Sequence, residues 1–404
     1  MTSPQRVVHV VTVAMTLPFL DGLLQFLRTR QVDVHVVAAP EPLLDQFAAA
    51  TGVQRHAVEM TRSISPVRDL LALWRLYRLF GRLRPDVVHA HTPKGGMLGV
   101  IAARLAGVPA VLYTIHGLPF ANATGARRTL LKACELVSCR LAHRVFSVSG
   151  SMRSLAVAEK LTGMEKLSVI AHGSVGGIDA VDKFNPVMHA AAGKDWRIAN
   201  GIPADATVVT FIGRLRRDKG VLELERAWQQ VRAGDASAHL VLVGPVDSCE
   251  REVVDALQRL RGDARVRAIG LEWNTPPILA ASDLLVLPTY REGFPVTLLE
   301  AAAMALPVVA SAVPGCTDAV VPGLTGTLVA VRDVDALSQA IGSYLQNPGV
   351  RAAHGAAARS RVVRDFRPEH IWEETLTAYR RVLAQRGHYS GGTAAVAVAD
   401  RRVA

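Results

Sequence analysis

Short, uniformly apolar runs alternate with amphipathic stretches along almost the whole chain, and this alternation restricts the possible folds more than any other feature. Stretches with helical periodicity, such as 67–83 and 335–345, separate the apolar runs. Strands that are apolar on both faces are typical of parallel sheets with helices packed on both sides. The expected strands are 6–13, 33–39, 86–91, 110–115, 144–149 and 167–173 in the first half, and 207–213, 239–244, 266–270, 283–289, 307–311 and 326–330 in the second.

The alternation runs through the chain twice, which predicts two domains. The halves meet near 186–203, where the chain is polar and punctuated by Gly and Pro. The predicted fold class is α/β, with two doubly wound, Rossmann-like domains facing a cleft, and ligands of such folds bind at the carboxyl ends of the strands. The expected boundaries are 1–187 for the first domain, 188–367 for the second, 368–388 for a closing helix that can pack back on the first domain, and 389–404 for a disordered tail.

Charge is distributed unevenly between the two halves. The first 187 residues contain 21 Lys and Arg against 12 Asp and Glu, whereas the remainder contains 25 against 23. A basic first half favours a phosphorylated or membrane-surface partner on that side. The alternative is that Arg is abundant because of a GC-rich genome, without selection for binding. Half of the residues are apolar and a fifth are charged, which excludes a disordered chain.

The sequence favours a reduced, cytoplasmic protein. Its four cysteines are scattered and form no C-x-x-C pair, so no disulfide framework is expected. The apolar N-terminus contains polar residues and lacks a small-residue cleavage site, which favours a buried strand over a signal peptide. The apolar run 296–315 is interrupted by Glu300 and Pro307, and therefore predicts a helix followed by a strand rather than a membrane span.

Several cofactor classes lose support. No G-x-G-x-x-G follows the first expected strand and no G-x-x-x-x-G-K-[ST] occurs, which argues against an NAD enzyme and a P-loop NTPase. Asp333 and Asp335 resemble a metal–nucleotide pair, but they precede an amphipathic stretch and are interpreted as a helix cap. No cluster of His, Cys or carboxylates shows metal-ligand spacing, so the sequence predicts no metal site.

The stretch "REGFPVTLLEA" (291–301) places two carboxylates around the expected start of a helix. Glu292 lies in the loop after an expected strand, and Pro295 suits the first turn of the helix that contains Glu300. The first N–H groups of that helix, those of Val296 and Thr297, have no intrahelical acceptor and can bind an anion such as a diphosphate. Carboxylates on either side can accept hydrogen bonds from hydroxyls, a layout that matches a sugar nucleotide.

A basic loop supports the same interpretation. Arg214 and Lys219 follow the first expected strand of the second half and are flanked by Gly213 and Gly220. Two cations beside glycines suit phosphate contact and neutralisation of a leaving diphosphate. Alone, such a loop is more often a solvated surface feature. Together with the acidic motif at 291–301, the phosphate-binding interpretation is favoured.

These two elements resemble those of a known enzyme family. "GRLRRDKG" (213–220) followed by "REGFPVTLLEAAAMALPVVAS" (291–311) is similar to the retaining glycosyltransferases of family 4, which have the GT-B fold, and the resemblance extends over about 5–385. It implies that Arg214 and Lys219 contact the donor diphosphate, that Glu300 holds the ribose hydroxyls, and that Glu292 binds the transferred sugar.

One position departs from the family pattern. Many members have Gly where this chain has Pro295, which cannot donate an N–H to the sugar. The sugar contacts are then expected to shift to Gly293 and Phe294, and the identity of the donor sugar stays open. Bases are often held by backbone groups in the loops near Gly244 and Gly270. The expected donor-binding set is Gly213, Gly244, Gly293, Phe294, Val296, Thr297 and Glu300.

The first half narrows the resemblance to a subgroup. "AHTPKGGMLG" (90–99), "YTIHGLPF" (113–120) and "HGSVGGIDAVDKFNP" (172–186) are similar to bacterial transferases that build capsules, exopolysaccharides and diacetylbacillosamine-type glycans on undecaprenyl diphosphate, mostly from UDP-sugars. The resemblance implies that His116, at a strand end, lies by the donor sugar near the reacting centre; a lone histidine is more often structural. The expected acceptor-binding residues are Thr16, Lys94, Gly95 and Gly96, with a tight turn and surface lysine as the alternative.

A basic-aromatic helix is expected over 68–84. Arg75, Arg78 and Arg82 recur at helical spacing with aromatic residues between them, a pattern suited to an anionic bilayer surface. An ordinary covering helix whose arginines extend to water explains the pattern equally well. Nucleic acid is not an expected partner, because aromatic residues are only 5% of the chain and no nucleic-acid module is visible.

The predicted activity is transfer of a hexosyl or N-acetylhexosaminyl unit, with retention, from a nucleotide sugar to a lipid-diphosphate-linked saccharide. The predicted catalytic residues are His116, Arg214, Lys219 and Glu292, and no metal or other cofactor is expected because cations and helix-start amides serve the diphosphate. The protein is expected in the cytoplasm, with peripheral attachment to the inner face of the membrane as an open possibility. Two alternatives remain: a UDP-sugar 2-epimerase on the same scaffold, and a non-catalytic sugar-nucleotide-binding partner in an assembly.

Overall fold

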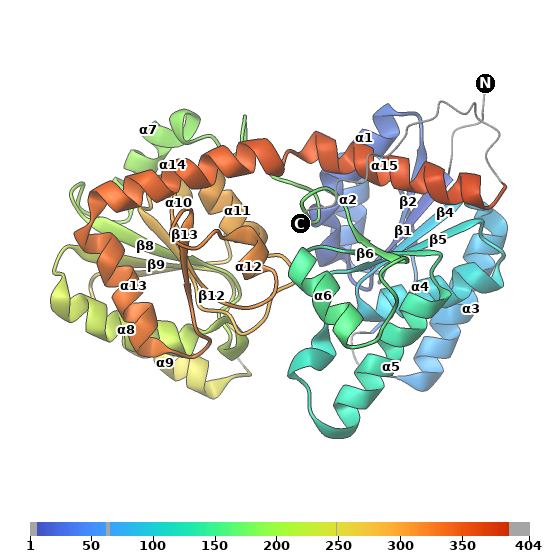
Figure 1. Cartoon of the computed structure of the whole chain (residues 1–404), viewed down its shortest axis with the longest axis horizontal. Coiled ribbons are helices and arrows are strands. Elements are labelled where there is room, and N and C mark those ends of the chain that lie inside the picture. Colours follow the sequence, from blue (N-terminus) through green and yellow to red (C-terminus); the bar gives the residue numbers. More distant parts are fainter. Residues whose placement is uncertain (1–5, 62–64, 248, 388–404) are drawn as a thin grey trace.

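The computed structural model describes residues 6–61, 65–247 and 249–387, which form two α/β domains side by side (Figure 1). Each domain is built on one parallel sheet, and the fold class expected from the alternation is confirmed. Every strand of the two sheets pairs with its neighbours in parallel register. The carboxyl ends of the strands in each sheet therefore meet at one edge.

The first sheet has the order β3-β2-β1-β4-β5-β6-β7 and the second has the order β10-β9-β8-β11-β12-β13. The direction of winding reverses between β1 and β4 in the first sheet and between β8 and β11 in the second. Such switch points open a crevice at the carboxyl ends of the two strands concerned. The strands are β1 (Arg6–Val10), β2 (Asp33–Ala38), β3 (Gln54–Ala57), β4 (Val87–His91), β5 (Ala110–Ile115), β6 (Arg144–Ser147), β7 (Leu167–Val169), β8 (Thr207–Ile212), β9 (Ala238–Val243), β10 (Val266–Gly270), β11 (Leu284–Leu287), β12 (Val308–Ser311) and β13 (Gly326–Val329).

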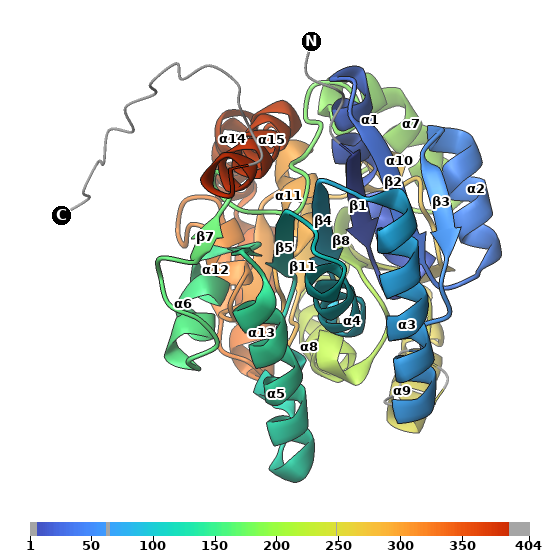
Figure 2. The ribbon, with the colours of Figure 1, turned by 90° about the vertical axis from the view of Figure 1, so that its right-hand side faces the viewer.

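Helices connect successive strands and cover the sheets (Figures 1 and 2). The α-helices are α1 (Asp21–Thr29), α2 (Pro42–Thr51), α3 (Pro66–Leu83), α4 (Pro93–Leu105), α5 (Gly125–Leu141), α6 (Gly150–Ala158), α7 (Pro186–Ala199), α8 (Val221–Gly234), α9 (Arg251–Arg261), α10 (Pro276–Ala280), α11 (Val296–Ala303), α12 (Cys316–Ala319), α13 (Val334–Gln346), α14 (Pro348–Asp365) and α15 (Pro368–Gln385). Three short 3₁₀ helices are η1 (Ala14–Phe19), η2 (Pro119–Asn122) and η3 (Arg217–Lys219). Asp333 caps α13 by accepting the N–H of Ala336, as expected from the sequence.

Two elements differ from the sequence-based expectation. Strand β3 was not predicted, because this edge strand is polar and mostly exposed and so lacks an apolar run. The joint expected near 186–203 is largely the helix α7, which begins with Asn185 as its cap and Pro186 at its first position. The predicted disordered tail at 389–404 lies outside the described residues.

The last two helices link the domains. Figure 1 shows α14 along the second domain and α15 along the first, so that together they cross from one sheet to the other. Helix α15 packs against α1, and the ring of Trp372 occupies the space that a side chain at Gly22 would need. Leu376 and Tyr379 of α15 belong to the same buried cluster as β1 and β2. Folding of the first domain therefore includes the end of the described chain.

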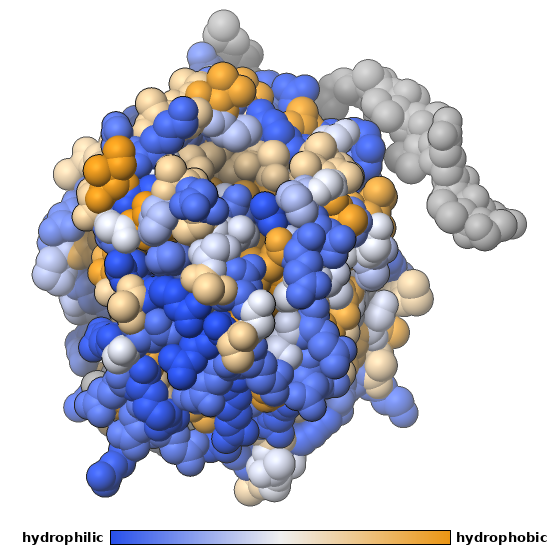
Figure 3. Space-filling view, turned by 90° about the vertical axis from the view of Figure 1, so that its left-hand side faces the viewer, coloured by the Kyte–Doolittle hydropathy of each residue, from blue (hydrophilic) through white to orange (hydrophobic). Residues whose placement is uncertain are grey.

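Helix α3 lies on the outer surface of the first domain, where it packs against α4 and lies next to β3 (Figure 2). Its Phe80 is buried in the core, whereas Trp74 and Tyr77 are exposed, and the guanidinium of Arg78 stacks on Trp74. In the part of the chain that the structure describes, no helix is both long and apolar enough to cross a membrane. The end face of the second domain is largely hydrophilic, with hydrophobic residues dispersed over it (Figure 3).

Candidate active site

A cavity of about 280 Å³ lies between the two domains, at the carboxyl ends of strands from both sheets. The second domain supplies the loops after β8 and β11, which are the two strands of its switch point. The first domain supplies the end of β5 and the side chains of α6. The cavity-lining residues that carry charge or an imidazole are His116, Arg214, Asp218, Lys219, Arg291 and Glu292. All four predicted catalytic residues thus line one cavity.

Lys219 and Glu292 form an ion pair in the lining of this cavity. The ammonium of Lys219 donates to Oε1 of Glu292, and the two side chains are only 17% and 13% exposed. Lys219 lies on η3 and Glu292 follows β11, so the pair joins the two loops of the switch point. A multiply charged anion that entered here would compete with Glu292 for the ammonium.

A second ionic contact fixes the same loops. Both guanidinium nitrogens Nε and Nη2 of Arg291 donate to Asp218, at 3.3 and 3.0 Å. The backbone carbonyl of Asp218 in turn accepts the N–H of Tyr290, at 2.9 Å. The loops after β8 and β11 are therefore crosslinked by charge and by backbone. This crosslink holds Lys219 in place without help from a ligand.

Two glycines permit the close contacts around the site. Gly220 has a φ of +74°, and a side chain there would meet the carbonyl oxygen of Pro288 at 2.0 Å. Gly293 packs against the first domain, where an added Cβ would lie 1.7 Å from the carbonyl oxygen of His116. The hydroxyl of Ser149 also donates to the carbonyl of Gly293, at 2.9 Å. Glycine at 293 thus brings His116 next to the acidic loop of the other domain.

Helix α11 begins immediately after this loop. Pro295 was expected in the first turn of this helix. It is instead the N-cap, the residue directly before the first helical residue, Val296. The N–H groups of Val296 and Thr297 occupy the first turn, where they have no intrahelical acceptor. Burial raises the pKa of Glu300 to about 7, with Lys183 opposing the shift. Partners that donate hydrogen bonds to this carboxylate would stabilise its ionised form.

His116 also borders a second cavity, of about 190 Å³. Its walls include Thr16 and Phe19 of η1, and Phe294 and Val296 from the start of α11. The hydroxyl of Thr16 donates to the carbonyl of Val13, at 2.6 Å. His116 therefore stands between a charged cavity and one lined mainly by apolar side chains, a position suited to the reacting centre of two substrates.

The other predicted donor-site glycines lie at the ends of β8 and β9. The N–H of Gly213 donates to the carbonyl of Val243, and the N–H of Gly244 donates to the carbonyl of Gly270. These amide groups are thus used within the second domain. Their roles in donor binding stay predictions.

The predicted acceptor residues on α4 are engaged in the first domain. The ammonium of Lys94 forms an ion pair with Asp69, at 2.7 Å, with both side chains largely buried. The N–H of Gly95 donates to the hydroxyl of Thr12, at 2.9 Å, and that of Gly96 to the carbonyl of Thr92. The geometry accounts for all three residues without an acceptor, and their proposed contact with a diphosphate stays a prediction.

Replacing Lys94 by methionine is expected to lower the free energy of unfolding by about 3–5 kcal/mol, because the Asp69 carboxylate would stay buried without its cation. The double variant Lys94→Met/Asp69→Asn should recover much of that loss. Urea unfolding followed by circular dichroism measures both effects. An unchanged stability in Lys94→Met would contradict a structural role, and a raised acceptor KM in the double variant would support the predicted binding role.

A buried group of histidines leads from His116, at the cleft, into the core of the first domain. It was not predicted from the sequence. His9 of β1 is in register with His89 of β4, and the alternation of a strand places His91 on the same face as His89. His91 bonds to both His9 and His116, at 3.0 and 2.9 Å. The spacing H-x-H within an expected strand, next to a second strand with a histidine, was the available signal.

The expectation that no metal-type cluster exists needs correction. One ring nitrogen each of His9, His89 and His91 lie within 4.8 Å of one another, which is compatible with a metal site by distance alone. The spacing of these histidines along the chain does not indicate their proximity, which results from the pairing of β1 with β4. The ring nitrogens of His9 and His91 face each other rather than a common point, and the absence of a metal stays a prediction.

Comparisons with known proteins agree with this geometry. Residues 206–347 match the family model described as glycosyl transferases group 1, and residues 19–173 match that of the glycosyl transferase 4-like domain. The alpha-maltose-1-phosphate synthase of Mycolicibacterium smegmatis is 32% identical over 317 residues, which cover 74% of this chain and 79% of that protein. This chain belongs to the family 4-like glycosyltransferases. The resemblance inferred from the basic loop 213–220 and from the two glutamates Glu292 and Glu300 is therefore confirmed.

Two further relatives cover more of the glycosyltransferase. The capsular polysaccharide biosynthesis glycosyltransferase CapM of Staphylococcus aureus is 28% identical over 383 residues, 94% of this chain and 98% of that protein. The UDP-Gal:alpha-D-GlcNAc-diphosphoundecaprenol alpha-1,3-galactosyltransferase of Escherichia coli is 27% identical over 335 residues, 80% of this chain and 85% of that protein.

Solved structures share the two-domain GT-B fold. A glycosyltransferase from Rickettsia africae superposes with a TM-score of 0.78 at 17% identity, covering 94% of this chain and 99% of that one. HepE of Anabaena, in complex with UDP and glucose, gives a TM-score of 0.77 at 18% identity, covering 93% of this chain and 99% of that one. At such identities the likeness establishes the fold of the glycosyltransferase alone.

Proposed function

We propose that this glycosyltransferase moves a hexosyl or N-acetylhexosaminyl unit from a UDP-sugar to a saccharide carried on a lipid diphosphate, with retention of the anomeric configuration, in cell-surface polysaccharide synthesis. The observation that carries the proposal is the cavity in which Lys219, Arg214 and Glu292 of one domain meet His116 of the other. Cations for a diphosphate, a carboxylate for sugar hydroxyls and an imidazole at a second cavity match a sugar-nucleotide donor facing an acceptor.

We propose the following reaction at these residues. The bond between the anomeric carbon and the diphosphate oxygen breaks, and an acceptor hydroxyl forms its bond to the same face of that carbon. The leaving diphosphate takes the hydroxyl proton, so that UDP departs and atoms and charge balance. Lys219 and Arg214 stabilise the negative charge that develops on the leaving oxygen. Before this step, the bound diphosphate displaces Glu292 from Lys219, and Glu292 accepts hydrogen bonds from the sugar.

The relatives support the donor and acceptor classes. The Escherichia coli relative is named for transfer of galactose from UDP to a diphosphoundecaprenol-linked sugar, and the Staphylococcus aureus relative for capsule synthesis. HepE, which has the same fold, binds UDP and glucose. Exposed Trp74 and Tyr77 on α3 support a peripheral contact with anionic lipid. Sedimentation with anionic and neutral vesicles tests that contact.

A turnover screen tests the proposed function. Purified full-length protein is incubated with UDP- and GDP-sugars, each with and without short-chain polyprenyl-diphosphate saccharides, and the products are identified by mass spectrometry. We expect one UDP-sugar to be consumed only with a lipid-linked acceptor, at a rate that EDTA leaves unchanged. The anomeric configuration of the product, determined by NMR, tests retention.

The remaining outcomes separate the alternatives. Conversion of a nucleotide sugar without acceptor would establish a 2-epimerase. Binding without turnover on any acceptor would establish a non-catalytic partner. Two observations argue against the non-catalytic alternative. The charged residues around the cavity are intact, and the relatives are named as transferases and synthases.

A further inference from the structure

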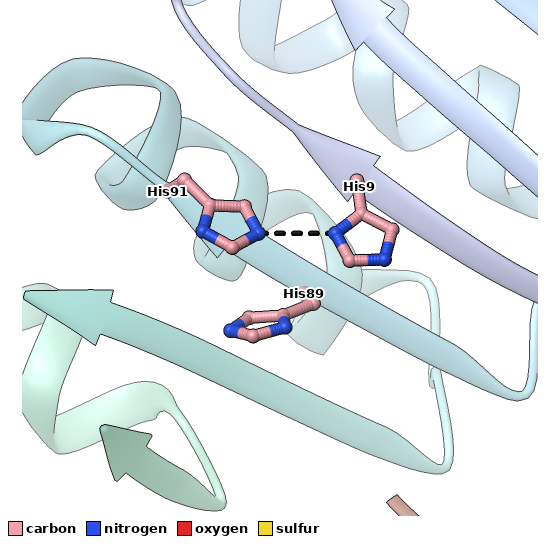
Figure 4. A group of neighbouring side chains, drawn as sticks. All are labelled: His9, His89 and His91. Carbon is pink, nitrogen blue, oxygen red and sulfur yellow. Dashed lines mark hydrogen bonds between the residues drawn. The ribbon is translucent and has the colours of Figure 1, made fainter. Parts of the chain in front are cut away.

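A chain of hydrogen bonds between imidazole rings leads from the interior of the first sheet to the cleft. Nδ1 of His9 and Nε2 of His91 lie 3.0 Å apart, and Nδ1 of His91 and Nε2 of His116 lie 2.9 Å apart. His9 is 0% exposed and His91 is 3% exposed. Figure 4 shows His9 on β1 and His91 on β4 joined by the first of these bonds. His116 thus enters the active site with its Nε2 already used, which leaves Nδ1 for a substrate.

The three rings are neutral at physiological pH. Burial lowers the pKa of His9 to about 3 and that of His116 to about 4. Burial and the neighbouring histidines also hold the pKa of His91 well below its usual range. A neutral imidazole has one N–H donor and one acceptor nitrogen. Two bonds among three neutral rings therefore leave only two proton arrangements, which run in opposite directions.

The inner end of the chain distinguishes these arrangements. Nε2 of His9 is buried and has no hydrogen-bond partner among the described residues. If the chain donates inward, from His116 to His91 to His9, this buried nitrogen carries a proton without an acceptor. If the chain donates outward, from His9 to His91 to His116, Nε2 of His9 is unprotonated and its lone pair has no donor. Among backbone groups in protein interiors, an N–H without an acceptor is rarer than an oxygen without a donor. We apply the same preference to the imidazole of His9, which favours the outward direction.

We propose that His91, held by His9, is a positioning residue that fixes His116 as the Nδ1–H tautomer. His116 then presents a neutral N–H donor to an oxygen of the transferring sugar. This inference rests on the proposed function for its consequence in catalysis, but the tautomer itself is a property of the free protein. It assigns to His91 and His9 a role in the reaction that acts through His116.

The third histidine of the cluster does not convert it into a metal site. Both nitrogens of His89 are used, Nδ1 by the hydroxyl of Tyr379 and Nε2 by that of Thr114, each at 2.6 Å. Its ring lies over that of His91, with centroids 4.1 Å apart. A three-histidine site needs one nitrogen of each ring aimed at a common point. In this cluster the nitrogens of His9 and His91 instead point at each other (Figure 4).

NMR of the full-length protein with ¹⁵N-labelled histidine tests the tautomer directly, without substrate. The signals of His116 are assigned by their absence in His116→Gln. We expect Nδ1 of His116 to carry the proton at pH 7 and Nε2 to be unprotonated. A proton on Nε2 would overturn the proposal, whatever the enzyme transfers. One equivalent of tightly bound metal in the purified protein, lost in His9→Leu, would overturn it as well.

Two variants at position 91 connect the tautomer with catalysis. The ionised carboxylate of His91→Asp can only accept, so a neutral His116 then donates from Nε2 and loses its N–H toward the sugar. The ¹⁵N spectrum of this variant distinguishes that neutral tautomer from a His116 protonated on both nitrogens. We expect kcat to fall about ten-fold, the size of one hydrogen bond, with a smaller change in donor KM. His91→Asn keeps a neutral amide that can donate to Nε2 of His116, and should retain most of kcat and the Nδ1–H tautomer. Equal kcat values for the two variants, with opposite tautomers, would show that the tautomer has no catalytic role. If His91→Asp does not fold, the spectrum of the unmodified protein still decides the assignment.

Discussion

Replacing Lys219 by methionine is expected to lower kcat for sugar transfer by about 10²–10³-fold, with a smaller change in donor KM. The side chain of Lys219 lines the cavity between the two domains and is only 17% exposed. A cation held in place before the reaction stabilises charge that grows on the leaving diphosphate, and such pre-organised contacts supply the largest single share of many rate enhancements. Methionine keeps the length and apolar part of the side chain and removes the charge.

The measurement is initial-rate kinetics with the donor and acceptor identified by the turnover screen. Lys194→Met is the matched control, because Lys194 is an exposed lysine on α7. A Lys219→Met enzyme that keeps more than about a tenth of kcat would remove Lys219 from the catalytic set. The double variant with Glu292→Gln adds a further test, since residues in one ion pair should show non-additive effects on kcat.

The second half of the site was predictable because its signals are local. Lys219 and Glu292 each follow a strongly apolar strand, and the loops after neighbouring parallel strands meet at one sheet edge. The expectation that both would face one ligand therefore needed only the strand assignment and the family pattern. The position of Pro295 was off by one residue, within the usual uncertainty of helix ends.

The first half of the site was harder to predict because it depends on contacts between distant segments. His9 and His91 are 82 residues apart, and only the register of β1 with β4 brings them together. Lys94 follows a strand as an anion-binding residue would, but its partner Asp69 lies on a different helix, α3. The edge strand β3 was missed for a related reason, since its polar residues carry no periodic apolar signal.

The cavity also explains why the two halves of the site cannot be treated separately. His116 reaches the acidic loop only because Gly293 lets the carbonyl of His116 approach the backbone of the other domain. The chain of histidines orients His116 from one side, and the ion pairs of Lys219 and Arg291 fix the loops on the other. Each domain therefore prepares its half before a donor binds, which reduces the ordering that catalysis requires.

The first domain is expected to lose stability steeply as pH falls below about 6.5. Burial holds the pKa of His9 near 3 and those of His89 and His91 well below 6.5, so these rings stay neutral when folded but bind protons when unfolded. Stability is then fully present above the unfolded pKa and declines as pH drops. Each ring contributes a slope of up to about 1.4 kcal/mol per pH unit, so His9, His89 and His91 together contribute about 4 kcal/mol per unit below pH 6. His116, whose pKa burial also lowers to about 4, adds to this slope, and Glu135, whose pKa burial raises to about 7, opposes it.

Urea unfolding at pH 7.5, 6.5, 6.0 and 5.5 measures this slope, with a fluorescence or circular dichroism signal from the first domain. His9→Leu should reduce the slope by about one proton. A slope no greater than one proton in the unmodified protein would mean that these histidines are protonated in the folded state. It would also weaken the histidine chain, because a ring with two N–H groups cannot accept a hydrogen bond from its neighbour. The same titration therefore tests the stability of the domain and the neutrality on which the tautomer of His116 depends.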